Sequence, residues 1–134
     1  MNLTDAQQVL AGTAWGEARG QGDMAMQAVI NVVQNRVRLQ TWTGKTVVEV
    51  CLKPWQFSSW NKTGPNRAKI MAVKDTDPQF AVALALADLA FNDELVDVTN
   101  GADSYFDTSI ALPSWAKGKP LLKTIGALRF YKVL

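Results

Sequence analysis

The chain has 134 residues, 48% hydrophobic and 19% charged, which is typical of one folded domain (1–134) and excludes a disordered segment. Its net charge of +2 is too small for a nucleic-acid-binding surface. Histidine is absent, which excludes Ser-His-Asp and Cys-His catalysis and every histidine-ligated metal site.

Cys51 is the only cysteine and lies in the apolar stretch "VVEVCLKP", so we interpret it as a core residue with no disulfide partner in the chain. Nothing in the sequence suggests a metal or another cofactor. The N-terminus lacks the basic and apolar regions of a signal peptide. The longest weakly polar stretch, "FAVALALADLAF", is too short to cross a membrane and contains Asp88, so we expect no membrane insertion.

The first forty residues predict two helices. Thr4 and Gln7 have the spacing of a capping box, which predicts a helix from there to about Ala18. The glycines that follow end this helix, and Asp23 caps the next one. Apolar residues at helical spacing predict one buried stripe along the second helix: Met26, Val29, Ile30, Val33 and Val37.

The middle of the chain predicts two further helices and a loop. Thr46 caps a short helix that Pro54 closes. The stretch "PWQFSSWNKTGPNR" has no periodicity and predicts an ordered surface loop that runs through Gly64 and Pro65. The pair at 77–78, Asp then Pro, is a helix start, and an apolar face follows it: Phe80, Leu84, Ala87 and Phe91.

The last thirty residues change in character. "DSYFDTSIAL" and "LLKTIGALRFYKV" are rich in aromatic and β-branched residues, and a turn-rich segment, "PSWAKGKP", separates them. This pattern predicts a small antiparallel hairpin. The expected class is α+β, a mainly helical domain with a minor antiparallel sheet.

Glu17 is the glutamate without an ordinary structural explanation. Glu49 has a capping position, and Glu94 lies in the polar stretch "NDELVD". Glu17 would lie in the last turn of the first helix, beside Trp15, where the helix dipole and apolar neighbours both disfavour a carboxylate. Both effects raise the pKa of a carboxyl group, as a general acid requires, and the nearby glycines would let a substrate approach. The structural alternative is an ion pair that anchors the helix end, with Arg19 or Arg36 as the partner.

Aromatic residues near the middle of the chain suggest a sugar-binding platform. Trp55, Phe57, Trp60 and Trp115 could stack on sugar rings, with Gln56, Ser58 and Asn61 as hydrogen-bonding groups. An acid beside such a platform is the outline of a glycosidase cleft. The alternative for each aromatic residue is packing in the core.

Several segments in one order are similar to the cell wall hydrolase family typified by the spore-cortex-lytic enzyme SleB. They are "GEARG" (16–20), "AV" (28–29), "VVQNRV" (32–37), "VCLKPWQFSSW" (50–60), "GADSYF" (101–106), "PSWA" (113–116) and "TIGALRFYK" (124–132). The resemblance spans about Gln8 to Lys132.

The resemblance implies a lysozyme-like domain that cleaves peptidoglycan between N-acetylmuramic acid and N-acetylglucosamine. It implies that Glu17 is the catalytic acid and that the reaction is that of a lytic transglycosylase, which leaves a 1,6-anhydro ring. It also implies a cleft lined by residues that match the family pattern, which with the platform tryptophans make the expected substrate-binding set: Asn35, Trp55, Gln56, Phe57, Trp60 and Tyr105. Asn35 has the alternative of an amide bonded to the backbone.

The chain departs from the family pattern in its acids and histidines. Gln21 stands where a second glutamate is usual, a third acid near Met24 is missing, and Ser104, Phe106 and Leu128 replace histidines. No role of those histidines, including metal binding, transfers to this chain.

Two other functions stay open. The same bond could be hydrolysed if a second carboxylate exists, with Asp23, Asp103 and Asp107 as candidates. A non-catalytic glycan-binding or virion structural module is the other alternative, although the retained Glu17 argues against it. We expect a monomeric bacteriophage endolysin that binds peptidoglycan glycan strands, stays in the host cytoplasm until lysis, and whose mild positive charge favours the anionic wall.

Overall fold

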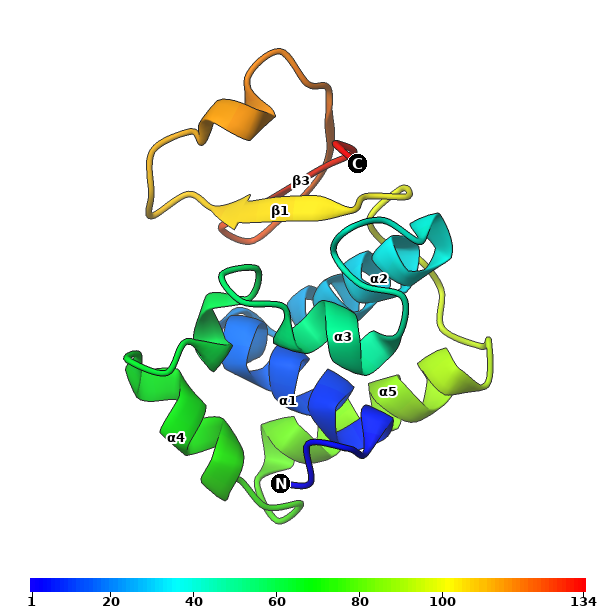
Figure 1. Cartoon of the computed structure of the whole chain (residues 1–134), viewed down its shortest axis with the longest axis vertical. Helices are drawn as coiled ribbons and strands as arrows, with labels where there is room; N and C mark the ends of the chain where they lie inside the picture. The colour runs from blue at the N-terminus through cyan, green and yellow to red at the C-terminus, as the bar shows by residue number, and fades with distance from the viewer.

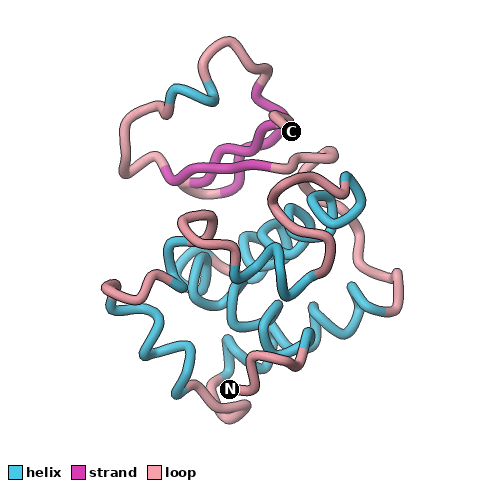
Figure 2. The backbone as a smooth tube through the Cα atoms, viewed as in Figure 1, coloured by secondary structure: helices cyan, strands magenta, loops and turns pink.

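The computed structural model describes residues 1–134 and places five helices beside a three-stranded sheet (Figure 1). The elements are α1 (Ala6–Ala18), α2 (Asp23–Leu39), α3 (Val47–Leu52), α4 (Pro65–Ala72), α5 (Pro78–Phe91), β1 (Ser104–Asp107), β2 (Leu121–Ile125) and β3 (Leu128–Tyr131). All strands lie in one part of the molecule and the long helices in the other (Figure 2). The expected α+β class is confirmed.

Helix α1 is the centre of the helical part. It packs against α2, α3, α4 and α5, and a continuous run of its residues, from Val9 to Trp15, is buried. A helix that is apolar all round is one that neighbours cover on every side. Its glycines permit this packing, because a Cβ at Gly12 would lie 2.9 Å from Cγ2 of Ile70 in α4.

Helix α2 has the expected amphipathic pattern. Four of the five stripe residues are buried and Val37 is partly buried, which confirms the prediction. Asn31 and Arg36 are also buried, at 2% and 7% exposure, although neither is one of the apolar stripe residues. Both side chains reach the connection between α5 and β1: Val98 N–H donates to Asn31 Oδ1 (3.0 Å), and Arg36 Nε donates to the Asp103 carbonyl (2.7 Å).

The helix caps are partly as expected. Thr46 accepts from the Glu49 N–H at the start of α3, and Asp77 accepts from two N–H groups at the start of α5, which confirms both caps. The predicted cap of α1, Thr4, is wrong, because Asp5 is the residue whose side chain accepts from the Gln8 N–H. The predicted cap of α2, Asp23, is also wrong. Asp23 is the first residue of the helix, and the capping position is Gly22, which has no side chain to accept a hydrogen bond.

The loop predicted for "PWQFSSWNKTGPNR" extends without α-helix as far as Gly64, and only its last three residues are helical. A single 3₁₀ turn spans Ser58–Trp60, and Pro65 then begins α4, a helix that the sequence pattern did not predict. Ile70 is the one buried residue of α4, so the short helix lacks the repeated apolar positions of a helical pattern. In α5, Phe91 is 46% exposed and does not belong to the buried face expected for it.

The sheet has the order β1-β3-β2, with both pairs antiparallel. The expected hairpin is therefore a three-stranded sheet, because the last apolar segment bends back on itself at Gly126, whose φ is +55°. The turn-rich segment follows β1 and carries a 3₁₀ turn at Ser114–Ala116. Packing of Phe106, Ala116 and Tyr131 attaches this segment to the sheet.

The core lies between the helices and extends under the sheet, where Leu128 and Phe130 are buried. Cys51 is fully buried and unpaired, which confirms its interpretation as a core residue. None of the helices combines the length and the apolar character needed to cross a membrane.

Candidate active site

Glu17 lies in the last turn of α1, half-buried, and accepts two hydrogen bonds from distant parts of the chain. The phenol of Tyr105 on β1 donates to Oε1 at 2.6 Å. The backbone N–H of Ser59 donates to Oε2 at 2.9 Å. The carboxyl group is therefore fixed between the sheet and the Ser58–Trp60 turn.

Gly16 explains why this turn can approach the helix so closely. A Cβ at this position would lie 2.9 Å from Ser59 Cβ and 2.5 Å from Ile70 Cδ1. A larger residue would push the turn away and with it the N–H that holds Glu17. Ser59 Oγ also faces this contact and is a buried side-chain polar atom without a hydrogen-bond partner.

Tyr105 is a permanent hydrogen-bond donor at neutral pH. Burial raises the pKa of its phenol well above the usual value of 10.0, and the neighbouring Glu17 carboxylate raises it further. Its ring lies between Phe57 and Phe130, with centroids 6.4 Å and 5.5 Å away. The ring contacts orient the phenol, and the raised pKa keeps its proton available to Glu17.

The ion-pair alternative for Glu17 does not fit the observed contacts. The Arg19 guanidinium donates to the carbonyl oxygens of Trp15 and Gly16 and to Asn66 Oδ1, and it lies 4.1 Å from the centre of a Trp15 ring. Arg19 thus caps the carboxyl end of α1. Arg36 also makes no hydrogen bond to Glu17, so neither arginine anchors it.

Glu17 faces a cleft of about 420 Å³ between the helical part and the sheet. One wall comes from the end of α1 and residues 55–58, and the other from β1 and the segment after it. Five of the predicted site residues line it together, with Trp115 from the predicted platform: Glu17, Trp55, Gln56, Phe57, Tyr105 and Trp115.

Trp55 forms the rim of the cleft and is 81% exposed. Its backbone has φ +69°, a conformation that is unfavourable for a residue with a side chain. An exposed indole in a strained backbone position is unusual, because folding gains nothing from it. Trp55 therefore has the placement expected of a sugar-stacking residue.

Two predicted substrate-binding residues do not line the cleft. Trp60 is 6% exposed, and its Nε1 donates to Thr13 Oγ1 (2.9 Å), so it belongs to the core beneath the turn. Asn35 donates to the Ala102 carbonyl (2.8 Å) and to Asp97 (3.0 Å). Although burial acts in the opposite direction, hydrogen bonds from Thr99 and Asn35 lower the pKa of Asp97 overall. The contacts of both residues are structural.

Arg36 is a cleft residue that the sequence pattern suggested only as an anchor for Glu17. Its Nη1 donates to Gln56 Oε1 (3.1 Å), and its guanidinium lies 5.3 Å from the centre of the Phe57 ring. Burial lowers the pKa of Arg36, and the guanidinium is nevertheless charged because it is a very weak acid. The sequence held a signal for the burial of Arg36. It follows Val29 by seven positions and Val33 by three, which is the spacing of the buried stripe.

Asp107 is the second carboxylate of the cleft. Gln21 Nε2 donates to its Oδ2 (3.1 Å), and the Ser109 N–H donates to its Oδ1 (2.8 Å). Asp103 is fully buried and accepts from the Val133 and Leu134 N–H groups, so its role is structural. Asp23 is not among the cleft residues.

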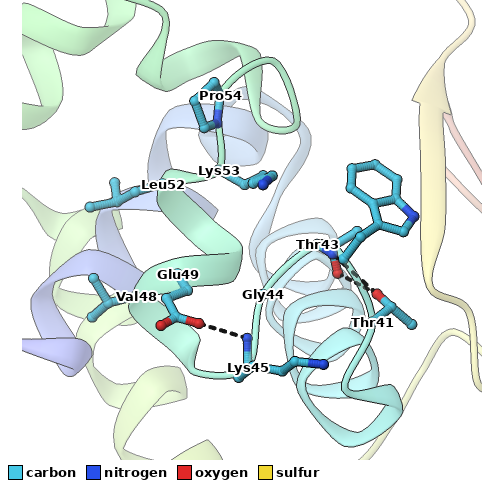
Figure 3. A pocket seen from close by; sticks show the side chains of 10 residues that line it. Thr41, Thr43, Gly44, Lys45, Val48, Glu49, Leu52, Lys53 and Pro54 are labelled. Atoms are coloured by element: carbon cyan, nitrogen blue, oxygen red, sulfur yellow. Dashed lines mark hydrogen bonds between the residues drawn. The ribbon is translucent and has the colours of Figure 1, made fainter.

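A separate hollow of about 570 Å³ lies beside the connection between α2 and α3 (Figure 3). Its only carboxylate, Glu49, accepts from the Lys45 N–H at 2.9 Å, and the hydroxyls of Thr41 and Thr43 bond to each other. These polar groups stabilise the connection itself. The acid of the candidate site faces the other cleft.

No group of three His, Cys, Asp or Glu side chains is placed to hold a metal ion. The cleft combines a half-buried acid, a permanent donor to that acid, a buried guanidinium and exposed indoles. An acid fixed beside a site for a sugar chain is the arrangement that general acid catalysis of glycosidic bond cleavage requires.

Comparisons with known proteins give consistent results. A family model described as Cell Wall Hydrolase matches residues 20–131, a range that begins just after Glu17. The catalytic domain of the Bacillus cereus SleB protein is similar, with 24% identity and a TM-score of 0.70 over 95% of this chain and 89% of that chain. The catalytic domain of the germination-specific lytic transglycosylase SleB from Bacillus anthracis has 26% identity and a TM-score of 0.73 over 95% and 93%. No curated protein sequence matches.

Proposed function

Because this chain belongs to the cell wall hydrolase family, we propose that it cleaves peptidoglycan glycan strands between N-acetylmuramic acid and N-acetylglucosamine. The observation that carries this proposal is Glu17 held toward the cleft by Tyr105 and the Ser59 N–H. The solved structure of a lytic transglycosylase with similar fold supports the same reaction class.

The proposed reaction is that of a lytic transglycosylase, with Glu17 as the single acid and base. Glu17 in its protonated form gives its proton to the bridging oxygen, and the bond from this oxygen to the muramyl C1 breaks. The 6-hydroxyl of the same sugar then bonds to C1, and Glu17 takes the hydroxyl proton. The products are a free 4-hydroxyl and a 1,6-anhydro ring, and no water is consumed.

The neighbouring residues have distinct proposed roles. Tyr105 keeps the carboxyl group oriented through both proton transfers. Trp55 and Trp115 stack on sugar rings along the cleft, and Gln56, oriented by Arg36, bonds a sugar substituent. Phe57 is 2% exposed and supports the Tyr105 ring from below.

Hydrolysis of the same bond is the second candidate, and the presence of Asp107 in the cleft favours it. In that reaction a second carboxylate activates water or stabilises the cationic sugar. In this chain Asp107 already accepts hydrogen bonds from Gln21 and the Ser109 N–H, which reduces its capacity as a base. The single-acid reaction is therefore preferred.

Digestion of purified peptidoglycan followed by mass spectrometry tests the proposal. We expect anhydro-muropeptides from the wild type and none from Glu17→Gln, since an amide cannot deliver a proton. Glu94→Gln is a matched control, because Glu94 is exposed and outside the cleft. Products with reducing muramic acid would indicate hydrolysis, and equal activity of wild type and Glu17→Gln would remove Glu17 from the mechanism.

We further propose that the enzyme acts as a monomeric endolysin that stays in the producing cell until lysis. The net charge of +2 supports binding to the anionic wall. Production in a bacterium should leave the culture dense until the inner membrane is permeabilised, and Glu17→Gln should then fail to lyse it. Lysis without permeabilisation would contradict the proposed confinement.

A further inference from the structure

A second pocket of about 490 Å³ lies next to the cleft, on the other side of Trp55. Trp55 and Phe57 line both cavities, so the two are neighbours that share the exposed indole. The pocket is formed by the end of α3, by residues 60–63 and by Leu3 from the N-terminus. We call it the basic pocket, for the cations among its lining residues: Lys53, Lys62 and Arg67.

The basic pocket contains three cations and no carboxylate. Lys53 and Lys62 are exposed, and Lys53 lies at the end of α3 beside Pro54 (Figure 3). Arg67 is partly buried, and its Nη1 donates to the Trp60 carbonyl (3.2 Å). A group of cations without acidic partners produces a positive potential that attracts anionic ligands.

The rest of the lining is mainly apolar, with Asn61 and Thr63 as its neutral polar residues. Leu3, Leu52 and Pro54 surround the cations, together with the edges of Trp55 and Trp60. A pocket for phosphate alone would not need such walls, because phosphate binds through donors and charge. Mixed apolar walls and separated cations fit a short peptide that carries methyl groups and carboxylates.

Such a peptide is attached to the substrate of the proposed reaction. Each muramic acid residue bears a lactyl ether to which a stem peptide is joined, and this peptide carries free carboxylates. When the sugar chain lies in the cleft, the peptide of a bound muramic acid projects to one side of it. Trp55 lies between the two regions, because it lines both the cleft and the basic pocket.

We propose that the basic pocket binds the anionic stem peptide of a muramic acid residue whose sugar ring occupies the cleft. This inference rests on the proposed function. Lys53 and Lys62 supply the charge that recognises the carboxylates, the apolar walls contact the peptide methyl groups, and Trp55 keeps glycan and peptide apart. The enzyme therefore distinguishes peptide-bearing glycan strands from bare ones.

The test compares soluble glycan strands of matched length, with stem peptides and after their removal by an amidase, in a preparation free of phosphate polymers. For Lys53→Gln/Lys62→Gln we expect KM on peptide-bearing strands to rise about fivefold, the effect of two exposed charge contacts. KM on bare strands should match the wild type. Lys74→Gln/Lys123→Gln has the same charge change on exposed residues outside both cavities and should match the wild type on both substrates.

The outcomes separate the two proposals. A wild type that cleaves neither substrate would overturn the proposed function itself. If the wild type cleaves both substrates and Lys53→Gln/Lys62→Gln has the wild-type KM on peptide-bearing strands, only the peptide site is overturned. Phosphate would then be the next ligand to test in the basic pocket. An equal loss on both substrates would show that the pocket contacts glycan, which also overturns the peptide site.

Discussion

The carboxyl group of Glu17 is positioned by two donors that reach it from opposite sides of the cleft. The Ser59 N–H comes from a turn 42 residues away, and the Tyr105 phenol comes from a strand 88 residues away. A side chain held at both oxygens loses little entropy when the substrate binds, which favours reaction from a defined geometry. Of the two donors, only Tyr105 can be removed by substitution without change to the backbone.

Tyr105→Phe should lower kcat by about 10- to 100-fold, the effect of one hydrogen bond to a charged group, with little change in KM. The ring contacts with Phe57 and Phe130 are kept, so the melting temperature should change little. Tyr131→Phe is the matched control, because Tyr131 is also a tyrosine of the sheet but does not line the cleft. An unchanged kcat for Tyr105→Phe would mean that this hydrogen bond does not position the acid.

The close contact between α1 and the Ser58–Trp60 turn brings the second donor to Glu17. Gly16 is the residue that permits it, and Gly20, in the same "GEARG" segment, has no atom within 4 Å of a Cβ added to it. The two glycines therefore differ in function although the motif presents them alike. Gly16 is required by packing, whereas Gly20 lies in open space beside the cleft-facing end of the helix.

Gly16→Ala should destabilise the fold by about 1–3 kcal/mol, because overpacking outweighs the roughly 1 kcal/mol that alanine gains in a helix. The shifted turn should also lower kcat, since the Ser59 N–H moves away from Glu17. Chemical denaturation and a turnover assay measure the two effects. Gly20→Ala should remain within about 0.5 kcal/mol of the wild type. Comparable stability of the two variants would contradict the packing role assigned to Gly16.

A thiol in the core and a phenol in the cleft wall make the whole fold sensitive to alkaline pH. Burial raises the pKa of the Cys51 thiol from 9.0 to about 12, and burial together with Glu17 raises the pKa of Tyr105 well above 10.0. The folded protein holds these protons where the unfolded chain has lost them. The stability they contribute is complete below pH 9 and is lost as pH rises toward the folded-state values.

The free energy of unfolding should therefore fall above pH 9 through Cys51 and above pH 10 also through Tyr105, by about 1.4 kcal/mol per pH unit for each group. Urea denaturation at intervals from pH 7 to 11 measures this slope. In Cys51→Ala the part of the slope between pH 9 and 10 should be smaller, because only the thiol titrates there in the unfolded chain. A slope that is the same in both proteins would contradict a thiol held neutral by burial.

Local patterns determined a large part of this protein. The stripe of α2, the caps of α3 and α5, the β-rich end and the burial of Cys51 all follow from residues close in sequence. Glu17 was identified because the helix dipole and an apolar neighbour, Trp15, disfavour a carboxylate at that helix end. These features depend on backbone propensity and apolar spacing, which a single sequence displays directly.

Only the tertiary structure decided which of these residues meet. Trp55 lies at the cleft rim while Trp60, five residues on, is in the core, and Asn35 bonds the α5–β1 connection while its neighbour Arg36 reaches the cleft. Helix α4 and the β1-β3-β2 order were likewise not predicted. Each of these outcomes depends on contacts between segments tens of residues apart, and such contacts leave no periodic signal in the sequence. The sequence alone therefore indicated Glu17 as the candidate acid and most of the elements, and the fold selected the donors and the walls of the cleft.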